Sequence, residues 1–186
     1  VVDHSIDCEA GDEVVIDAHP EAEDLVVALV EAIADAGGHP LVIQERTGKR
    51  FRRAYLRNFD GEFEAPDHVK ALYEAMDAYI AIKGSDNETQ LADVDTGTQA
   101  AYERAYEPVK ETRLQKTWNL TLFPAPANAQ QAEMATEEYE NFVWDAIVKD
   151  WDAVAEHQQP MADRLTEAEK VRIVSGETTD LTMSVA

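Results

Sequence analysis

The sequence has 186 residues, the size of one ordinary domain or of one domain and the beginning of another. It carries 38 Asp and Glu against 16 Lys and Arg, and its net charge of −22 argues against nucleic acid as a partner. No run of about eighteen apolar residues occurs, so the sequence predicts no membrane-spanning helix.

The acidic residues are spread along the whole chain. Because 45% of the residues are hydrophobic and several segments are periodic, this charge does not indicate disorder. The chain is either an ordinary acidic cytosolic protein or one adapted to molar salt, where charges are screened within about 3 Å. We favour salt adaptation, because so large a charge strains a compact state at low salt. The single cysteine, Cys8, fits a reducing, cytoplasmic compartment. Val1 in place of Met leaves open that the native N-terminus is missing.

The stretch from Gly11 to Gly38 and the residues after it indicate the fold class. Glu13–Asp17 is a short apolar run bounded by turn residues, as in a buried strand. Apolar residues then recur at helical spacing from Leu25 to Ala36, and a second strand begins at Pro40. Strand, helix and strand of this length form a right-handed parallel βαβ unit. We therefore predict an α/β fold: a three-layer open sheet, mainly parallel, with helices on both faces.

Four short apolar runs, each after a helix-length segment, predict neighbouring and mainly parallel strands: 14–16, 41–43, 79–82 and 118–120. Parallel strands share their carboxyl ends, and ligands bind at that edge of an open sheet. The loops after these strands supply the candidate residues of an edge for ligand binding or domain docking: His19, Ser85, Asp86, Asn87, Pro124 and Asn128. For residues 84–88 a helix N-cap at Ser85 or Asp86 is the more common explanation.

Five of the sixteen basic residues lie between Lys49 and Arg57, in a segment with helical spacing. An anion site is one interpretation. The other is a helix whose arginines pair with carboxylates of the same chain or of a second subunit. In so acidic a chain pairing is favoured, since Arg is the usual choice for paired and interface charges. Arg50, Arg53 and Arg57 are therefore candidate interface residues.

Helices are also predicted over 67–76 and over 98–109, with a stop or kink at Pro108. A longer helix is predicted over 137–156, with the pattern broken at Pro160. Trp144 and Trp151 lie at the edge of the apolar stripe of that helix and are candidate interface residues, although such a stripe is more often core.

Two strands are predicted near the end of the chain, over 170–174 and 179–185. The second has no visible partner. We therefore expect that the sequence is cut from a longer protein.

The motifs of several site classes do not occur in the sequence. No two histidines lie three or four residues apart, and there is no His-Glu-x-x-His motif. There is also no Gly-x-Gly-x-x-Gly after the first strand, no Gly-Lys-Ser/Thr phosphate loop and no Gly-x-Ser-x-Gly elbow. The βαβ unit alone is therefore weak evidence for nucleotide binding.

An ordered set of short motifs resembles one family. The motifs are Gly11–Ala18, Pro20–Ala22, Ala36–Pro40, Phe123–Pro124, Ala129–Met134, Glu137–Tyr139 and Thr179–Leu181. Together they are similar to the N-terminal half of the aminopeptidase T and aminopeptidase S family of dinuclear metallo-aminopeptidases. The resemblance covers nearly the whole chain.

The resemblance implies an N-terminal α/β domain, residues 1–168, followed from 169–186 by the start of a catalytic domain. In the family two divalent metal ions, Zn or Co, are held by Glu, His, Asp and Tyr after the segment that matches Thr179–Leu181. No metal ligand or catalytic residue is therefore carried over onto this sequence. The implied partners are the chain's own C-terminal catalytic domain, a peptide substrate and a second copy in a homodimer. With this family, the acidity suggests a halophilic archaeon as the source.

Two other functions fit the sequence. One is a free-standing, salt-adapted module that binds a small ligand near Gly84–Asn87. The other is a subunit-interaction domain that uses Trp144, Trp151 and the basic segment 49–57.

Overall fold

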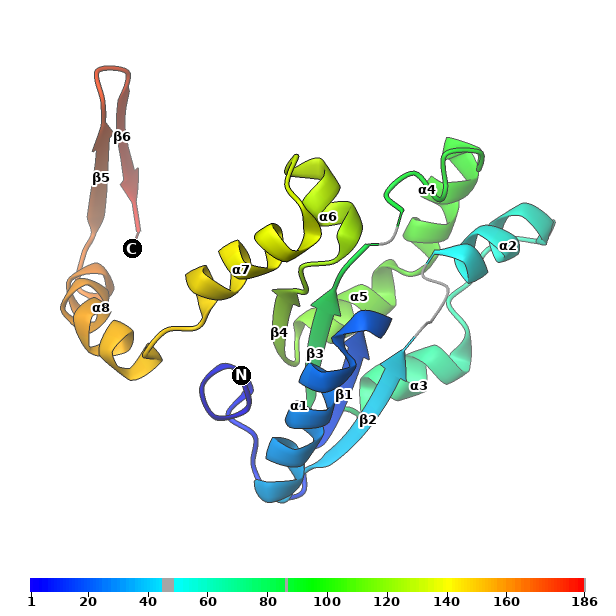
Figure 1. The fold of residues 1–186 in the computed structure, drawn as a ribbon, viewed down its shortest axis with the longest axis horizontal. Helices are drawn as coiled ribbons and strands as arrows, with labels where there is room; N and C mark the ends of the chain where they lie inside the picture. Colours follow the sequence, from blue (N-terminus) through cyan, green and yellow to red (C-terminus); the bar gives the residue numbers. More distant parts are fainter. Residues whose placement is uncertain (45–48, 86, 186) are drawn as a thin grey trace. The chain divides into compact units, whose positions relative to one another are not determined.

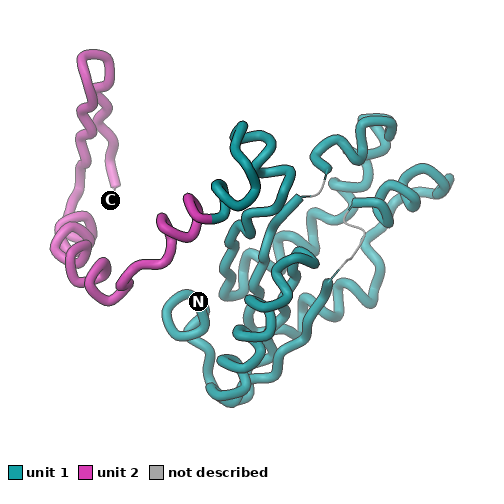
Figure 2. Tube along the Cα trace, viewed as in Figure 1, with its two compact units in different colours: residues 1–140 teal, residues 141–186 magenta. Residues whose placement is uncertain are grey.

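The computed structural model describes residues 1–44, 49–85 and 87–185. The chain divides into two compact units, residues 1–140 and residues 141–186, which are taken one at a time (Figure 2). No helix among the described residues is both long enough and apolar enough to cross a bilayer.

The first unit is built on one parallel sheet. Its strands are β1 (Glu13–Ala18), β2 (His39–Gln44), β3 (Ala78–Lys83) and β4 (Thr117–Leu122), in the order β2-β1-β3-β4 (Figure 1). All three pairings are parallel, and Ile16 lies opposite both Val42 and Ile80. The predicted sheet of four neighbouring parallel strands is therefore confirmed.

The helices of the first unit alternate with these strands, as the βαβ pattern predicts. They are η2 (Pro20–Ala22), α1 (Glu23–Asp35), α2 (Arg50–Asn58), α3 (Asp67–Ala75), α4 (Thr96–Ala105), α5 (Glu107–Leu114) and α6 (Pro126–Gln131). The break predicted at Pro108 falls at Tyr106. Pro108 itself lies in the first turn of α5, where a missing N–H costs little.

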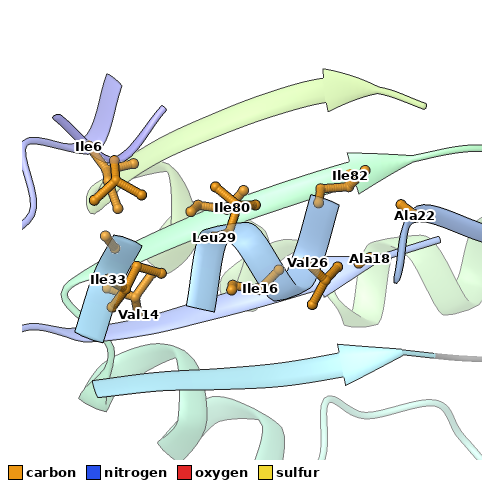
Figure 3. Close-up of a cluster of buried hydrophobic side chains, with 12 residues drawn as sticks. Ile6, Val14, Ile16, Ala18, Ala22, Val26, Leu29, Ile33, Ile80 and Ile82 are labelled. Carbon is orange, nitrogen blue, oxygen red and sulfur yellow. The ribbon is translucent and has the colours of Figure 1, made fainter. Parts of the chain in front are cut away.

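Helices cover both faces of the sheet. On one face α1 buries Val26, Leu29 and Ile33 against alternate residues of the two central strands (Figure 3). On the other face α3 covers Val15 and Tyr79, and α5 packs beside α3 (Figure 1). Because both faces of β1 and β3 are buried, these strands are almost continuously apolar. The three-layer α/β class is confirmed.

A short π-helical segment, η1 (Val2–Ile6), completes the α1 face. Val2 and Ile6 are each 4% exposed and belong to the same core cluster as Ile80. The segment also contacts β4. The first residues of the chain thus fill space beside α1 on that side of the sheet.

The long helix predicted over 137–156 is wrong. α7 (Thr136–Ile147), which runs across the division between the units, ends before a new helix, α8 (Trp151–Thr166), begins. The new start is fixed by Asp150, whose carboxylate accepts a hydrogen bond of 3.1 Å from the Ala153 amide. Trp144 and Trp151 consequently lie on different helices and not on one stripe.

The break predicted at Pro160 is also wrong, because α8 runs through this residue. Proline removes one helical donor. The Gln159 side chain donates from its Nε2 to the Asp163 carboxylate at 2.7 Å, across the turn that follows. The helix is also closed at its end by the Glu167 amide, which donates to the Asp163 carbonyl.

The second unit ends in a β-hairpin. β5 (Lys170–Ser175) and β6 (Thr179–Ser184) pair antiparallel, so both predicted strands are confirmed and β5 is the partner of β6. Arg172, which lies opposite Thr182, reaches diagonally across the hairpin to Asp180 in a two-pronged ion pair, with both N···O distances 2.7 Å. The domain boundary at 168/169 stays a prediction, whereas the division into compact units falls at 140/141.

Candidate functional site

The carboxyl ends of the four parallel strands are tied together by hydrogen bonds. The His19 amide, just after β1, donates to the Ile82 carbonyl at 2.9 Å, and the Phe123 amide, just after β4, donates to the Lys83 carbonyl at 2.6 Å. The Gln44 side chain at the end of β2 donates to the carbonyls of His19 (3.3 Å) and Pro20 (3.2 Å). Residues from four separate parts of the chain therefore form one continuous edge.

His19 lies at the centre of this edge and is only 8% exposed. Its Nδ1 accepts a hydrogen bond from the Glu21 amide at 3.4 Å, which caps η2. Its ring stacks on Phe123, with centroids 6.4 Å apart and planes 17° apart. A Cβ on Gly84 would lie 2.7 Å from His19 Cγ, so only glycine allows the β3 loop to pass this ring. The geometry gives His19 a packing and capping role.

The predicted loop residues meet at the same edge. The Ser85 carbonyl accepts a hydrogen bond of 3.2 Å from the Ala127 amide, which joins the loop after β3 to the start of α6. Pro124 is fully buried in that turn. Asn128 follows within α6, and its Oδ1 is buried without a hydrogen-bond partner among the described residues.

Asn87 orders the next turn and does not cap a helix. Its Oδ1 accepts from the Thr89 amide at 3.0 Å and from the Thr89 hydroxyl at 2.9 Å. Among the described residues, 88–93 form turns, and the next helix after Ser85, α4, begins only at Thr96. Asp86, the remaining predicted member of the edge, lies outside the described residues.

A groove opens beside the edge. It measures ≈ 300 Å³ and is lined by Pro20, Glu21, Glu23 and Gln44. Two of these residues are carboxylates at the start of the η2–α1 segment. The groove therefore has an acidic wall and suits a cationic group better than an anion.

A second polar cluster lies on the α3 face of the sheet, and the sequence analysis did not predict it. The Tyr79 phenol donates to Asp17 Oδ2 at 2.6 Å, and Lys83 Nζ lies 3.2 Å from the same oxygen. The Arg113 guanidinium lies 5.1 Å from the centre of the Tyr79 ring, in cation–π range. Burial, together with the Asp17 charge, raises the pKa of Tyr79 well above its usual range. The phenol thus stays protonated and serves as a donor.

One signal in the sequence points to this cluster. Asp17 is the only charge in the inner part of an otherwise buried strand, and a charge there needs a partner. The identity of the partner depends on which strand lies beside β1 and in which register, and the local pattern does not contain that information.

The basic segment forms α2, and its charges are largely paired within the chain. Arg53 and Arg57 both hold the Asp93 carboxylate, and the hydrogen bond from Arg53 lowers the pKa of Asp93 to about 2. Arg52 lies 3.2 Å from Glu103 and stacks over the Tyr102 ring at 5.2 Å. The predicted pairing with carboxylates is thus observed inside the chain. The interface role of Arg50, Arg53 and Arg57 stays a prediction.

The two tryptophans predicted at an interface both belong to the second unit. Trp151 begins α8 and is 53% exposed, whereas Trp144 is half-buried within α7. No contact with a second subunit is tested by a single chain, so their interface role also stays a prediction.

No metal centre forms among the residues that the structure describes. In those parts of the chain no three His, Cys, Asp or Glu side chains converge closely enough to hold an ion. The described residues therefore do not form a dinuclear metal site.

Comparison with known proteins identifies the family. The sequence profile of the thermophilic metalloproteases (M29) matches residues 1–186, the full length of the chain. The chain belongs to the thermophilic metalloprotease (M29) family. No curated protein matches it.

A solved structure shows the same fold. Wild-type AmpT from Thermus thermophilus superposes with a TM-score of 0.65 at 22% identity, over 98% of this chain and 50% of AmpT. This M29 chain thus spans half the length of that structure.

Proposed function

We propose that this chain is the N-terminal α/β part of a metal-dependent aminopeptidase and has no catalytic activity by itself. The observation that carries the proposal is the M29 match over residues 1–186 together with a fold that corresponds to half of AmpT. The lack of a converging set of metal ligands in the described residues supports a non-catalytic role for this part.

In this proposal the reaction is removal of the N-terminal residue of a peptide, and two divalent ions, Zn or Co, supply the activated water. The ions belong to the part of the enzyme that corresponds to the other half of AmpT. The residues of this chain help to position the substrate and take no part in the chemical step. We also propose that the enzyme acts in the cytoplasm of a salt-adapted cell.

The carboxyl edge is the proposed contact of this chain with its own catalytic domain, where it shapes the substrate cavity. Two observations support this choice. The edge is tied together by backbone hydrogen bonds at His19 and Ser85 and by the close packing of Gly84 on His19, and the groove beside it has Glu21 and Glu23 in its wall. An acidic wall attracts the N-terminal ammonium group of a peptide.

The test compares two purified proteins on aminoacyl p-nitroanilides at molar salt, with Co²⁺ or Zn²⁺ added. One is the 186-residue chain and the other is the product of its whole gene. We expect turnover from the gene product, lost on treatment with a chelator and restored by metal, and none from the 186-residue chain. Turnover by the chain alone would refute its non-catalytic role. A gene product without chelator-sensitive activity would refute the aminopeptidase assignment.

The edge is tested separately in the gene product. Glu21→Gln together with Glu23→Gln removes the acidic wall and should raise KM for peptides with little change in kcat, because both residues are remote from the metals in this proposal. Glu31→Gln, on α1 but outside the groove, is the matched control. Equal effects of the groove and control variants would show that the edge does not contact substrate.

A further inference from the structure

The basic helix α2 holds more positive charge than its ion pairs neutralise. Within the described parts of the chain, the five cations of segment 49–57 pair with three carboxylates, those of Glu88, Asp93 and Glu103. Arg53 and Arg57 share one of them, and Arg50 forms no ion pair with a described residue. The acidic loop that begins at Asp60 follows the other end of the helix. The first turn of α2 is therefore a local excess of positive charge in a chain of net charge −22.

Arg50 and Phe51 lie on the solvent side of α2. The helix buries Leu56, and at about 100° per residue Arg50 and Phe51 fall within about 60° of the opposite direction. Both are exposed, Phe51 to 62%. Tyr55 and Phe59 continue from Phe51 at spacings of four and eight residues and are 40% and 39% exposed. An unpaired guanidinium thus borders a row of aromatic rings that solvent reaches.

The aromatic row is held in place by α4. The Tyr55 ring lies 5.1 Å from the Phe59 ring and 6.2 Å from the Tyr102 ring of α4, measured between centroids. The Arg52 guanidinium lies 5.2 Å from the centre of the same Tyr102 ring. An exposed apolar patch with a polar rim is typical of a binding surface. A ligand that binds such an ordered surface also loses less affinity to the ordering of side chains.

The position of α2 relates it to the carboxyl edge of the sheet. Both α2 and α4 lie beyond the carboxyl ends of β2 and β3 (Figure 1). Gln44, which lines the acidic groove, precedes Lys49 by five residues, so their Cα atoms are at most about 18 Å apart. An extended peptide of about five residues spans the same distance. The acidic groove and the first turn of α2 thus offer opposite charges to the two ends of a short peptide.

We propose that Arg50 and Phe51 bind the part of a peptide substrate that lies up to about five residues from its N-terminus. Arg50 binds a carboxylate there, and Phe51 packs against an apolar side chain. A guanidinium suits this role because it holds a carboxylate by two parallel hydrogen bonds. The inference rests on the proposed aminopeptidase function and adds a substrate class: peptides with a negative charge in this part are preferred.

Charge selects a peptide as the occupant. The positive excess is confined to one helix turn, so a polyanion such as a nucleic acid would be repelled by the rest of the acidic surface. A single carboxylate on a largely neutral peptide meets much less repulsion. That carboxylate is either the C-terminus of a short peptide or an Asp or Glu side chain of a longer one.

The experiment compares pentapeptides as substrates of the whole gene product. Leu-Ala-Ala-Ala-Ala is supplied as the free acid and as the C-terminal amide, at the lowest KCl concentration that keeps the enzyme folded, because salt weakens exposed ion pairs. We expect KM to be about three- to ten-fold lower for the free acid, with kcat little changed.

Two further peptides separate the sources of the carboxylate. Both are C-terminal amides of Leu-Ala-Ala-Ala-X, in which X is Asp or Asn. An Asp amide with the low KM of the free acid shows that a side-chain carboxylate binds at Arg50. An Asp amide with the KM of the Asn amide assigns the preference to the C-terminal carboxylate.

Three variants test the residues. Arg50→Gln removes the charge and should raise KM for the free acid to that of the amide, without effect on the amide. Arg104→Gln on α4 is the matched control, because Arg104 is also exposed and has no ion pair with a described residue. It should keep the preference for the free acid. Phe51→Ala should raise KM for both peptides, and circular dichroism checks the folding of all three variants.

The outcomes separate this inference from the function on which it rests. Equal KM values for acid and amide in the wild type would overturn the inference, and so would equal effects of Arg50→Gln and Arg104→Gln. The aminopeptidase assignment would stand in both cases. An unchanged KM in Phe51→Ala would refute the role of Phe51. A gene product that cleaves none of the peptides would overturn the inference and the assignment together.

Discussion

The phenol of Tyr79 on β3 donates a hydrogen bond of 2.6 Å to the carboxylate of Asp17 on β1, from a side chain that is 2% exposed. The bond links the two central strands on the α3 face of the sheet. Lys83 shares the carboxylate at 3.2 Å.

The first prediction is that Tyr79→Phe destabilises the first unit by about 1 to 2 kcal/mol, because it removes a partly buried hydrogen bond to a charged group. Urea denaturation at molar salt measures the loss. Tyr55→Phe is the control. Its ring stays in the aromatic cluster with Phe59 and Phe63, and we expect a loss within about 0.5 kcal/mol. Equal losses in the two variants would show that the Asp17–Tyr79 bond contributes no stability of its own.

The second prediction concerns alkaline pH. Burial first, and then Asp17, raise the pKa of Tyr79 above the ordinary value of 10.0. Above pH 10 the unfolded chain releases the phenolic proton and the folded chain keeps it, so the free energy of unfolding falls as pH rises. Between about pH 10 and 11 the free energy of unfolding of Tyr79→Phe should therefore fall less steeply with pH than that of the wild type. Parallel curves for the two proteins would contradict this linkage.

The third prediction concerns Gly84. A Cβ there would lie 2.7 Å from His19 Cγ, so Gly84→Ala should cost about 1 to 3 kcal/mol through overpacking. His19→Ala removes the ring that the methyl group meets. In the double variant we therefore expect a loss smaller than the sum of the single losses, measured by denaturation of all four proteins. Strict additivity would mean that the strain lies elsewhere.

The fourth prediction concerns acid. The pKa of Asp93 is lowered from the ordinary value of 3.8 to about 2, and the main cause is the hydrogen bond that Asp93 accepts from Arg53. A lowered pKa stabilises the fold above 3.8, and this contribution is lost as pH falls toward 2. The difference in melting midpoint between wild type and Asp93→Asn should therefore shrink from about pH 5 to pH 2. Asp67→Asn, at an exposed i,i+3 pair with Lys70, should show little such change. A difference in melting midpoint between wild type and Asp93→Asn that does not change with pH would contradict the pairing of Asp93 with Arg53.

The fifth prediction concerns salt. With a net charge of −22, repulsion among carboxylates opposes folding until it is screened. The Debye length falls from about 10 Å at 0.1 M to about 3 Å at 1 M. The melting midpoint by circular dichroism should rise between 0.1 M and about 2 M KCl. A midpoint independent of salt would assign the acidity to ordinary surface charge and remove the support for salt adaptation.

The sheet could be predicted from the sequence because its signals are local. The runs around Ile16 and Ile80 are short, apolar and separated by helix-length segments, and that pattern admits few arrangements besides a parallel sheet. The shared edge at His19 and Ser85 follows from the parallel order alone. Ile16 is 0% exposed, as its place in the pattern indicates.

Other features depend on information that periodicity does not carry. The stripe on α7 and α8 keeps its period through the break at Ile147, so only the capping role of Asp150 could have revealed a second helix. The Arg53–Asp93 pair joins residues forty positions apart and depends on where α2 lies. The Asp17–Tyr79 bond depends in the same way on strand order.

The buried position of η1 has a consequence for how the chain folds. Val2 and Ile6 leave the ribosome well before β4, which is synthesised more than a hundred residues later, yet their segment contacts that strand. Contacts this distant in sequence form late, because the closure of a long loop must come first. The η1 segment is therefore expected to join the fold late and not to nucleate it. During synthesis the apolar side chains of η1 therefore stay exposed to solvent until β4 has emerged from the ribosome.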